Sequence, residues 1–170
     1  RPGTDVALLF GMPHHIFKNG WEGQDYIKER VYGIDKVREE VLQKWTPDKV
    51  TEVTGVPEAA VYAAAEAMAK NRPSTIIWCM GQTQHSIGNA FVRASCILQL
   101  ALGNVGVSGG GTNIYRGHDN VQGATDVGPH PDSLPGYYGL AEGAWKHWCK
   151  VWGVDYEWLK GRFASKELME

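Results

Sequence analysis

The sequence predicts an α/β fold that is rich in helix and contains a short, mostly parallel sheet. Helical patterns fill most of residues 1–72, and one apolar, β-branched run over 74–80 is typical of a strand. A polar turn and an amphipathic helix follow that run, which makes half of a βαβ unit. Because only one strand is strongly indicated, we expect a Rossmann-like part rather than a complete Rossmann domain.

The length of 170 residues predicts a single segment, which we divide into three parts. These are a helical part over 1–72, a strand–helix–loop part over 73–140 and an aromatic helical tail over 141–170. The net charge of −2 argues against nucleic acid as a partner. No apolar run reaches the length of about eighteen residues that a membrane span needs, so no direct span is expected. The chain opens without methionine, and we expect an internal segment of a longer protein.

The first helix is predicted from near-helical apolar spacing after a capping residue. Thr4 or Asp5 would cap a helix that begins at Val6. Pro13 lies inside the pattern and predicts a kink or a break. Gly20 is the expected end of this helix.

Three further helices are expected before the strand. A charged pattern over 24–44 predicts a helix that is interrupted at Gly33. The run "TPDKVTEVTG" predicts a short helix that Thr46 caps and Gly55 ends. The alanine-rich run over 57–71 predicts a strong helix.

The second half of the chain is predicted to hold the strand, one long helix and a long loop. We expect a buried strand over Ser74 to Met80 and an amphipathic helix over 82–104. The glycine- and proline-rich stretch from Val105 to Gly139 is expected to be a loop, mobile without a ligand. Two aromatic helices, over 141–152 and 156–169, should close the segment.

Three polar stretches are candidate sites. "GQTQH" (81–85) lies where a strand gives way to a helix, a place where ligands bind in α/β sheets, or it simply caps the helix. "SGGGTN" (108–113) lets a backbone approach a ligand, or it is a flexible turn. "RGHDNVQGATD" (116–126) offers a guanidinium suited to a carboxylate. Alternatively, its arginine pairs with Asp119 or Asp126 in an ordered loop.

The cysteines and the other histidines receive a structural interpretation. The spacing of the three cysteines matches no zinc or CxxC pattern, so no metal ligand is predicted, and we expect small buried hydrophobes. These residues are Cys79, Cys96 and Cys149. The histidines outside the polar stretches are expected in packing or turns, and they are His14, His15, His130 and His147.

Four motifs together resemble a known family. "RPGTDVALL", "CMGQTQH", "LALGNVGVSGGGTN" and "RGHDNVQGATDVGPHPDSLPGYYG" are similar to the catalytic (alpha) subunit of molybdenum- or tungsten-dependent formate dehydrogenases, within the molybdopterin oxidoreductases. The last motif is the one most specific to formate dehydrogenases. Its "GH" form, with the tryptophan-rich tail, resembles the periplasmic, respiratory type.

The resemblance implies roles for individual residues, with the part over 73–140 forming a wall for cofactor and substrate. It gives Arg116 a catalytic role, holding the carboxylate of formate. The positions that it assigns to the substrate pocket are Arg116, Gly117, His118 and Thr125. The positions that it assigns to a bis-molybdopterin guanine dinucleotide cofactor are Met80, Gly81, Gln84 and His118.

The implied reaction is the oxidation of formate to carbon dioxide, with electrons leaving through a 4Fe-4S cluster to an iron–sulfur electron-transfer subunit. The family's metal ligand is a cysteine or selenocysteine followed by histidine, and no cysteine here precedes a histidine. The cluster-binding motif is absent too. We therefore expect this segment to need the remainder of the catalytic subunit and to be inactive alone.

Two alternatives share much of this pattern. One is another molybdopterin oxidoreductase, such as a nitrate reductase-like enzyme. The other is a non-enzymatic nucleotide-binding module that keeps the fold. The stretch over 116–126 separates the first of these from a formate dehydrogenase.

Overall fold

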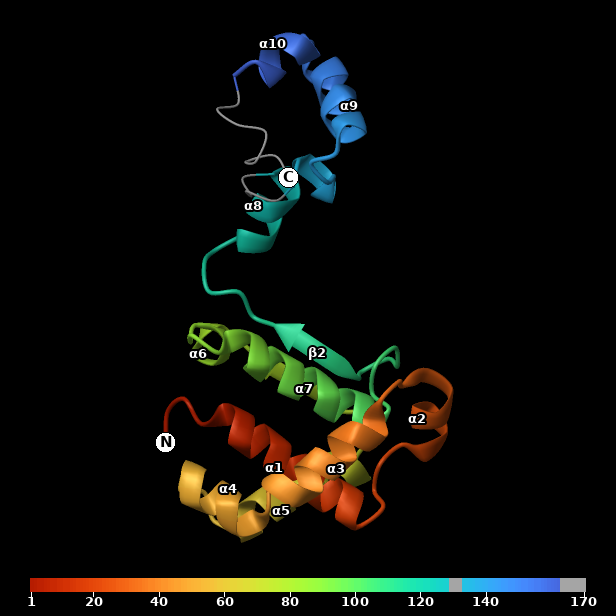
Figure 1. The fold of residues 1–170 in the computed structure, drawn as a ribbon, viewed down its shortest axis with the longest axis vertical. Coiled ribbons are helices and arrows are strands. Elements are labelled where there is room, and N and C mark those ends of the chain that lie inside the picture. Colours follow the sequence, from red (N-terminus) through yellow and green to blue (C-terminus); the bar gives the residue numbers. More distant parts are fainter. Residues whose placement is uncertain (129–132, 163–170) are drawn as a thin grey trace. The chain divides into compact units, whose positions relative to one another are not determined.

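The computed structural model describes residues 1–128 and 133–162, and it is rich in helix with one short parallel sheet. The predicted fold class is thereby confirmed at this level. The chain forms two compact units, Arg1–Tyr115 and Arg116–Glu170. Figure 1 follows the ribbon through both units. Each unit is described by itself.

Five helices precede the sheet in the first unit. They are α1 (Asp5–Lys18), α2 (Gln24–Arg30), α3 (Ile34–Lys44), α4 (Pro47–Thr54) and α5 (Glu58–Lys70). The predicted interruption at Gly33 is confirmed, since this residue has φ +76° just before α3. The predicted cap and end of α4 are confirmed as well. Thr46 accepts a hydrogen bond from the Lys49 backbone N–H, and Gly55 has φ +75°.

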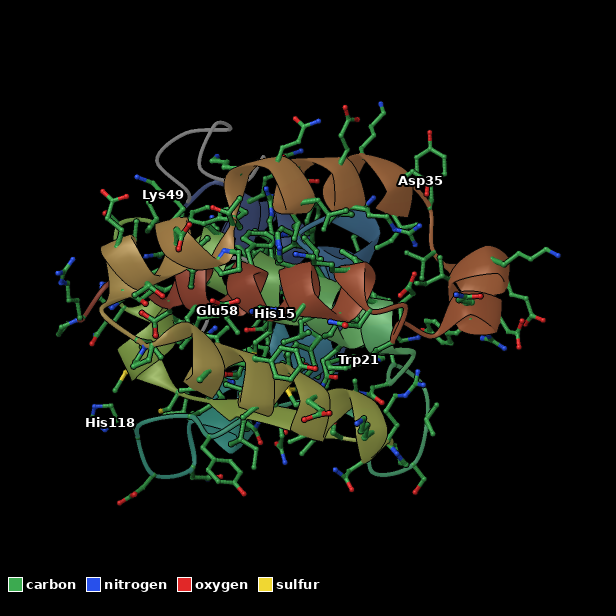
Figure 2. The ribbon with its side chains drawn as sticks, turned by 90° about the horizontal axis from the view of Figure 1, so that it is seen from below. His15, Trp21, Asp35, Lys49, Glu58 and His118 are labelled. Carbon is green, nitrogen blue, oxygen red and sulfur yellow. The ribbon has the colours of Figure 1, made fainter. Side chains whose placement is uncertain are left out.

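Helix α1 lies at the centre of the first unit. It contacts α3, α4, α5 and the later helix α7, and Figure 2 shows it between α3 and α5. Its buried side chains Leu9, Met12 and Ile16 belong to one apolar core with Val50 and Leu98. This core is large enough to anchor the sheet that follows.

The break predicted at Pro13 does not occur. Helix α1 is continuous from Asp5 to Lys18 with Pro13 inside it. Proline removes one intrahelical hydrogen bond, but Pro13 is almost completely buried among other helices. Packing around α1 therefore outweighs the local preference for a break.

The sheet has two parallel strands, β1 (Thr75–Trp78) and β2 (Gly111–Ile114). Residue Thr75 pairs with Gly111, and Trp78 pairs with Ile114. The predicted strand over 74–80 is confirmed in place but is shorter. Its expected burial is wrong, because Ile77 is 49% exposed while Trp78 is 9% exposed. Helix α7 contacts both strands and covers one face, as Figure 1 shows for β2.

The long helix predicted over 82–104 is two helices, α6 (Met80–Thr83) and α7 (Gly88–Leu102). The chain folds back on itself between them. A Cβ atom at Gly88 would lie 2.2 Å from the carbonyl oxygen of Thr83, so only glycine permits this approach. The second of these helices, α7, ends at Leu102, and Gly103 follows it with φ +72°.

A buried polar network joins the end of α7 to both strands. Gln99 donates through Nε2 to the carbonyl of Ser74, 3.0 Å away, and to the carbonyl of Gly111. Asn104 donates to Gln99 Oε1 at 2.7 Å and to Ser74 Oγ at 2.9 Å. Gln99 and Asn104 are 0% and 1% exposed. The network fixes where both strands begin, and so where β1 delivers the chain to α6.

The second unit contains α8 (Val121–Val127), the 3₁₀ helix η1 (Pro135–Tyr137), α9 (Glu142–Trp152) and α10 (Tyr156–Lys160). Together with β2, α8 and η1 show that the stretch over 105–139 is not one loop. The first aromatic helix is confirmed. The second ends at Lys160, and the remainder of its predicted span, over 163–169, lies outside the described residues. Within residues 1–128 and 133–162, no helix combines the length and apolar character needed to cross a membrane.

The residues given a structural interpretation mostly pack as expected. Cys149 is buried, while Cys79 and Cys96 are half-buried. Both histidines of α1, His14 and His15, are buried, at 5% and 4% exposed.

A third histidine also packs against aromatic rings. His147 stacks on Tyr138 with the ring centroids 5.3 Å apart. His130 lies outside the described residues.

Candidate functional site

The candidate substrate residues Arg116 and Thr125 are in direct contact. Arg116 Nη1 donates a hydrogen bond to Thr125 Oγ1 at 3.2 Å. Thr125 in turn donates its hydroxyl proton to the carbonyl of Val121, 2.8 Å away. With its proton committed to the helix, the hydroxyl can only accept from the guanidinium. The arginine is thereby held by a neutral group.

The turn into α8 makes this contact possible. Asn120 precedes the helix with φ +52°, in the left-handed region, and turns the chain back toward Arg116. Gly117 and His118 lie on the exposed connection between them. Figure 2 labels His118 on this connection. Of the four substrate candidates, the structure brings Arg116 and Thr125 into contact. Gly117 and His118 are exposed on the connection between them.

The alternative in which Arg116 pairs with a carboxylate of its own loop is wrong. Among the described residues, the ion pairs include none to Arg116, whether from Asp119 or from Asp126. Asp126 instead accepts a hydrogen bond from the Tyr137 hydroxyl. That hydrogen bond raises the pKa of the Tyr137 phenol. The guanidinium offers five N–H donors, so most of them remain available to an anion.

The candidate cofactor residues lie in the first unit, immediately after β1. Met80 and Gly81 begin α6, and Gln84 follows its last residue. All three are exposed. A Cβ atom added at Gly81 would meet nothing within 4 Å, so the backbone there is open to approach. An open backbone at the carboxyl end of a parallel strand suits a nucleotide-like ligand.

A polar hollow of about 250 Å³ lies beside these residues. It is lined by Thr83, His85, Ser86, Gly88, Asn89 and Val92. His85 Nε2 lies 3.0 Å from the carbonyl of Gly81, and its ring packs against Phe91 with centroids 5.1 Å apart. The sequence predicted a site over 81–85 only. The turn before α7 also brings residues as far as Val92 into the lining of the hollow.

Not every polar residue of this stretch faces outward. Gln82 donates through Nε2 to Ser95 Oγ at 2.7 Å and to the carbonyl of Phe91 at 3.2 Å. It therefore fixes α6 against α7. Gln82 therefore has a structural role at the start of α7, as the alternative to a ligand site predicted for residues 81–85. Met80, Gly81 and Gln84 are exposed and can contact a ligand.

The glycines over 108–113 have structural roles. A Cβ atom at Gly110 would lie 2.2 Å from the carbonyl oxygen of Asn104, and Gly109 and Gly111 have φ +82° and +93°. These glycines let the chain cross the end of α7 and enter β2. Their contacts account for them without a ligand.

No metal centre is found in the described part of the chain. Residues 1–128 and 133–162 contain no group of three or more histidine, cysteine, aspartate or glutamate side chains placed to hold an ion. The polar hollow and the open backbone at Gly81 suit an organic ligand with hydrogen-bonding groups instead.

The sequence over residues 1–149 matches the family model described as molybdopterin oxidoreductase. This chain belongs to the molybdopterin oxidoreductase family. The family's description names an oxidoreductase and a molybdopterin cofactor, a group that holds molybdenum or tungsten. The open backbone and polar donors after β1 are compatible with such a cofactor.

Among individual proteins, the chain is similar to subunits of formate dehydrogenases. The chain is 36% identical over 154 residues to the F420-dependent formate dehydrogenase subunit alpha of Methanocaldococcus jannaschii, covering 91% of this chain and 23% of that protein. It is 34% identical over 156 residues to formate dehydrogenase H of Escherichia coli, covering 91% and 22%. The resemblance to a formate dehydrogenase catalytic subunit is confirmed. The chain spans less than a quarter of the length of these two relatives.

Proposed function

We propose that this chain is part of a formate dehydrogenase catalytic subunit, which oxidises formate to carbon dioxide at a bis-molybdopterin guanine dinucleotide site holding molybdenum or tungsten. The observation that supports it most is the contact between Arg116 and Thr125, two residues that the family resemblance assigns to one pocket. The similarity to relatives named formate dehydrogenase supports it independently.

The chemistry of the substrate explains why an arginine is needed. Formate is a small anion with few groups to hold, and a planar guanidinium grips both carboxylate oxygens at once. Such a grip fixes the direction of the C–H bond and stabilises negative charge. In this proposal Thr125 orients the guanidinium, while Gly117 leaves space and His118 lies beside the substrate.

The candidate cofactor residues would bind the pterin groups by backbone and side-chain contacts. Met80, Gly81 and Gln84 would do so from the end of β1, and His118 from the connection before α8. The bound cofactor would supply the two-electron chemistry. These residues would hold it in place and exclude water from its edge.

The proposed function requires further parts of the protein and partner groups that accept electrons. The remainder of the catalytic subunit would complete the site, and a 4Fe-4S cluster and an iron–sulfur subunit would accept the electrons. We also propose a periplasmic location, on the "GH" motif and the tryptophan-rich tail.

The decisive experiment replaces Arg116 in the whole protein. We expect Arg116→Ala to lower kcat/KM for formate by about 100-fold or more, as loss of a charge-stabilising group does. Arg116→Lys should recover only part of this, because lysine keeps the charge without the fork. Arg30→Ala, at an exposed position on α2, is the matched control and should change nothing. Unchanged formate kinetics in Arg116→Ala would remove the proposal.

Substrate assays of the whole protein address the alternatives. Turnover of nitrate but not of formate by the unaltered protein would favour a nitrate reductase-like enzyme. Family membership favours an enzyme over a non-enzymatic nucleotide-binding module.

A further inference from the structure

Asp126 is the residue next to the hydrogen-bond partner of Arg116, and its carboxylate is bound elsewhere. It follows Thr125 directly on α8, and Thr125 accepts the hydrogen bond of Arg116 at 3.2 Å. Asp126 Oδ1 instead accepts from the Tyr137 hydroxyl. In the described part of the chain, no ion pair joins Asp126 to Arg116. The guanidinium is therefore left with a neutral partner.

The backbone at Tyr137 is strained. Its φ is +61°, a conformation that costs free energy for a residue with a side chain. A bridge between Leu134 and Tyr138 closes the turn around it, with the Leu134 N–H donating to the Tyr138 carbonyl at 2.7 Å. Leu134 is 5% exposed, so the turn is anchored. Strain that the surrounding structure maintains points to a positional requirement on the side chain.

Close packing joins η1 to the end of α8. Gly128 follows the helix with φ +98°, and a Cβ atom there would lie 2.8 Å from the backbone nitrogen of Pro135. Helix α8 has seven residues, too few to be stable on its own. The contacts with η1 therefore hold the helix, and with it the positions of Thr125 and Asp126.

We infer that Tyr137 is a positioning residue for the formate clamp, because its hydroxyl occupies Asp126 and keeps that carboxylate from pairing with Arg116. This inference rests on the proposed function. A free carboxylate on the same loop would compete with formate for the same fork of donors, at the high effective concentration of an intramolecular group. Loss of the Tyr137 hydroxyl would release the Asp126 carboxylate to compete.

The test is a double-mutant cycle in the whole enzyme. We expect Tyr137→Phe to raise the KM for formate by about tenfold, the scale of one hydrogen bond to a charged group, with a smaller change in kcat. The dissociation constant of nitrite, an anion of the same shape, should rise equally in a binding titration without turnover. Tyr138→Phe is the control. Its hydroxyl makes no hydrogen bond within the described residues, and its ring contacts His147 and Trp148.

The second mutation separates competition from structural damage. Asp126→Asn added to Tyr137→Phe should restore the formate KM, because an amide has no charge with which to compete. A KM that stays raised in the double variant would overturn the inference, as would an unchanged KM in Tyr137→Phe. Arg116→Ala keeps the two proposals apart. If Arg116→Ala loses formate turnover but Tyr137→Phe has normal kinetics, only the inference about Tyr137 is wrong. If Arg116→Ala has normal formate kinetics, the proposed function itself is wrong.

Discussion

The buried histidines His14 and His15 link the stability of the first unit to pH. Burial lowers the pKa of both, and each histidine side chain is next to a positive charge or to the other histidine. The carbonyl of Val41, which lies near His14 Nδ1, opposes this shift only in part. Figure 2 shows His15 between α1 and α5, with Glu58 nearby.

The sign of the effect follows from which state binds protons. Between the lowered folded-state pKa and the ordinary value of 6.5, the unfolded chain is protonated and the folded chain is not. The free energy of unfolding is therefore full above pH 6.5 and falls as the pH drops below it. Denaturant unfolding of the 170-residue chain at several pH values should show this fall, and His14→Gln with His15→Gln should flatten it. Equal stability on both sides of pH 6.5 would contradict the prediction.

The close approach of the backbone at Gly88 to Thr83 predicts that a side chain at this position lowers the stability of the fold. Gly88→Ala should destabilise the fold by roughly 1–3 kcal/mol, since the new Cβ meets backbone that cannot move aside. The control is Gly143→Ala in α9, where a Cβ meets nothing within 4 Å and alanine favours the helix. Urea unfolding of both variants is the measurement. A Gly88→Ala variant as stable as the parent chain would show that the close approach to Thr83 relaxes freely.

The candidate site residues were identified by their resemblance to family motifs. The spacing of apolar residues did not indicate them. Arg116 and Thr125 stand nine positions apart in a stretch with no apolar pattern, so only the resemblance put them in one pocket. Their contact depends on the left-handed turn at Asn120, which a sequence pattern does not specify. Tyr137 was missed because its role depends on Asp126, an interaction across a turn.

At the level of elements, the buried amide network ties the sheet to α7. Gln99→Leu removes both bonds to the strands, so the Ser74 carbonyl loses this donor, while the Gly111 carbonyl still accepts from Thr75 Oγ1. We expect a loss of about 1–3 kcal/mol in the free energy of unfolding, the cost of one polar group left without its partner. Thermal and urea unfolding of the 170-residue chain measure it. Gln43→Leu, at an exposed position on α3, should cost little, and an equal loss in both variants would argue against the network.

Helices with local signals were predictable, and elements held by distant contacts were not. The glycines that delimit α3, α4 and α7 act through their own backbone, so the sequence shows them directly. Strand β2 is short and exists through pairing with β1, which is far away in the chain. Helix α8 has no apolar stripe and depends on η1. Pro13 was misjudged because the surrounding core, not the helix alone, decides whether α1 continues.

At the level of the whole molecule, the segment should lack activity by itself. The sequence contains no cysteine followed by histidine, the pattern that the family resemblance requires at the metal. We expect the purified 170-residue chain to show no formate-dependent reduction of a dye, whereas the proposed function requires this activity of the whole protein. Formate oxidation by the segment would contradict this prediction.

The net charge argued against nucleic acid as a partner, and the composition did not identify the family. The four motifs identified the family, and the match over 1–149 agrees with them. The division into parts over 1–72, 73–140 and 141–170 stays a prediction. So does the expectation that the stretch over 105–139 moves without cofactor.

The side-chain amide of Gln99 carries two protons, and its nitrogen donates to one carbonyl beside each strand. An isotope label on this single nitrogen would therefore report on the two strands through two separate resonances. If one strand detached first on warming, its proton would exchange with heavy water sooner than the other. One residue can in this way time the order in which the sheet comes apart.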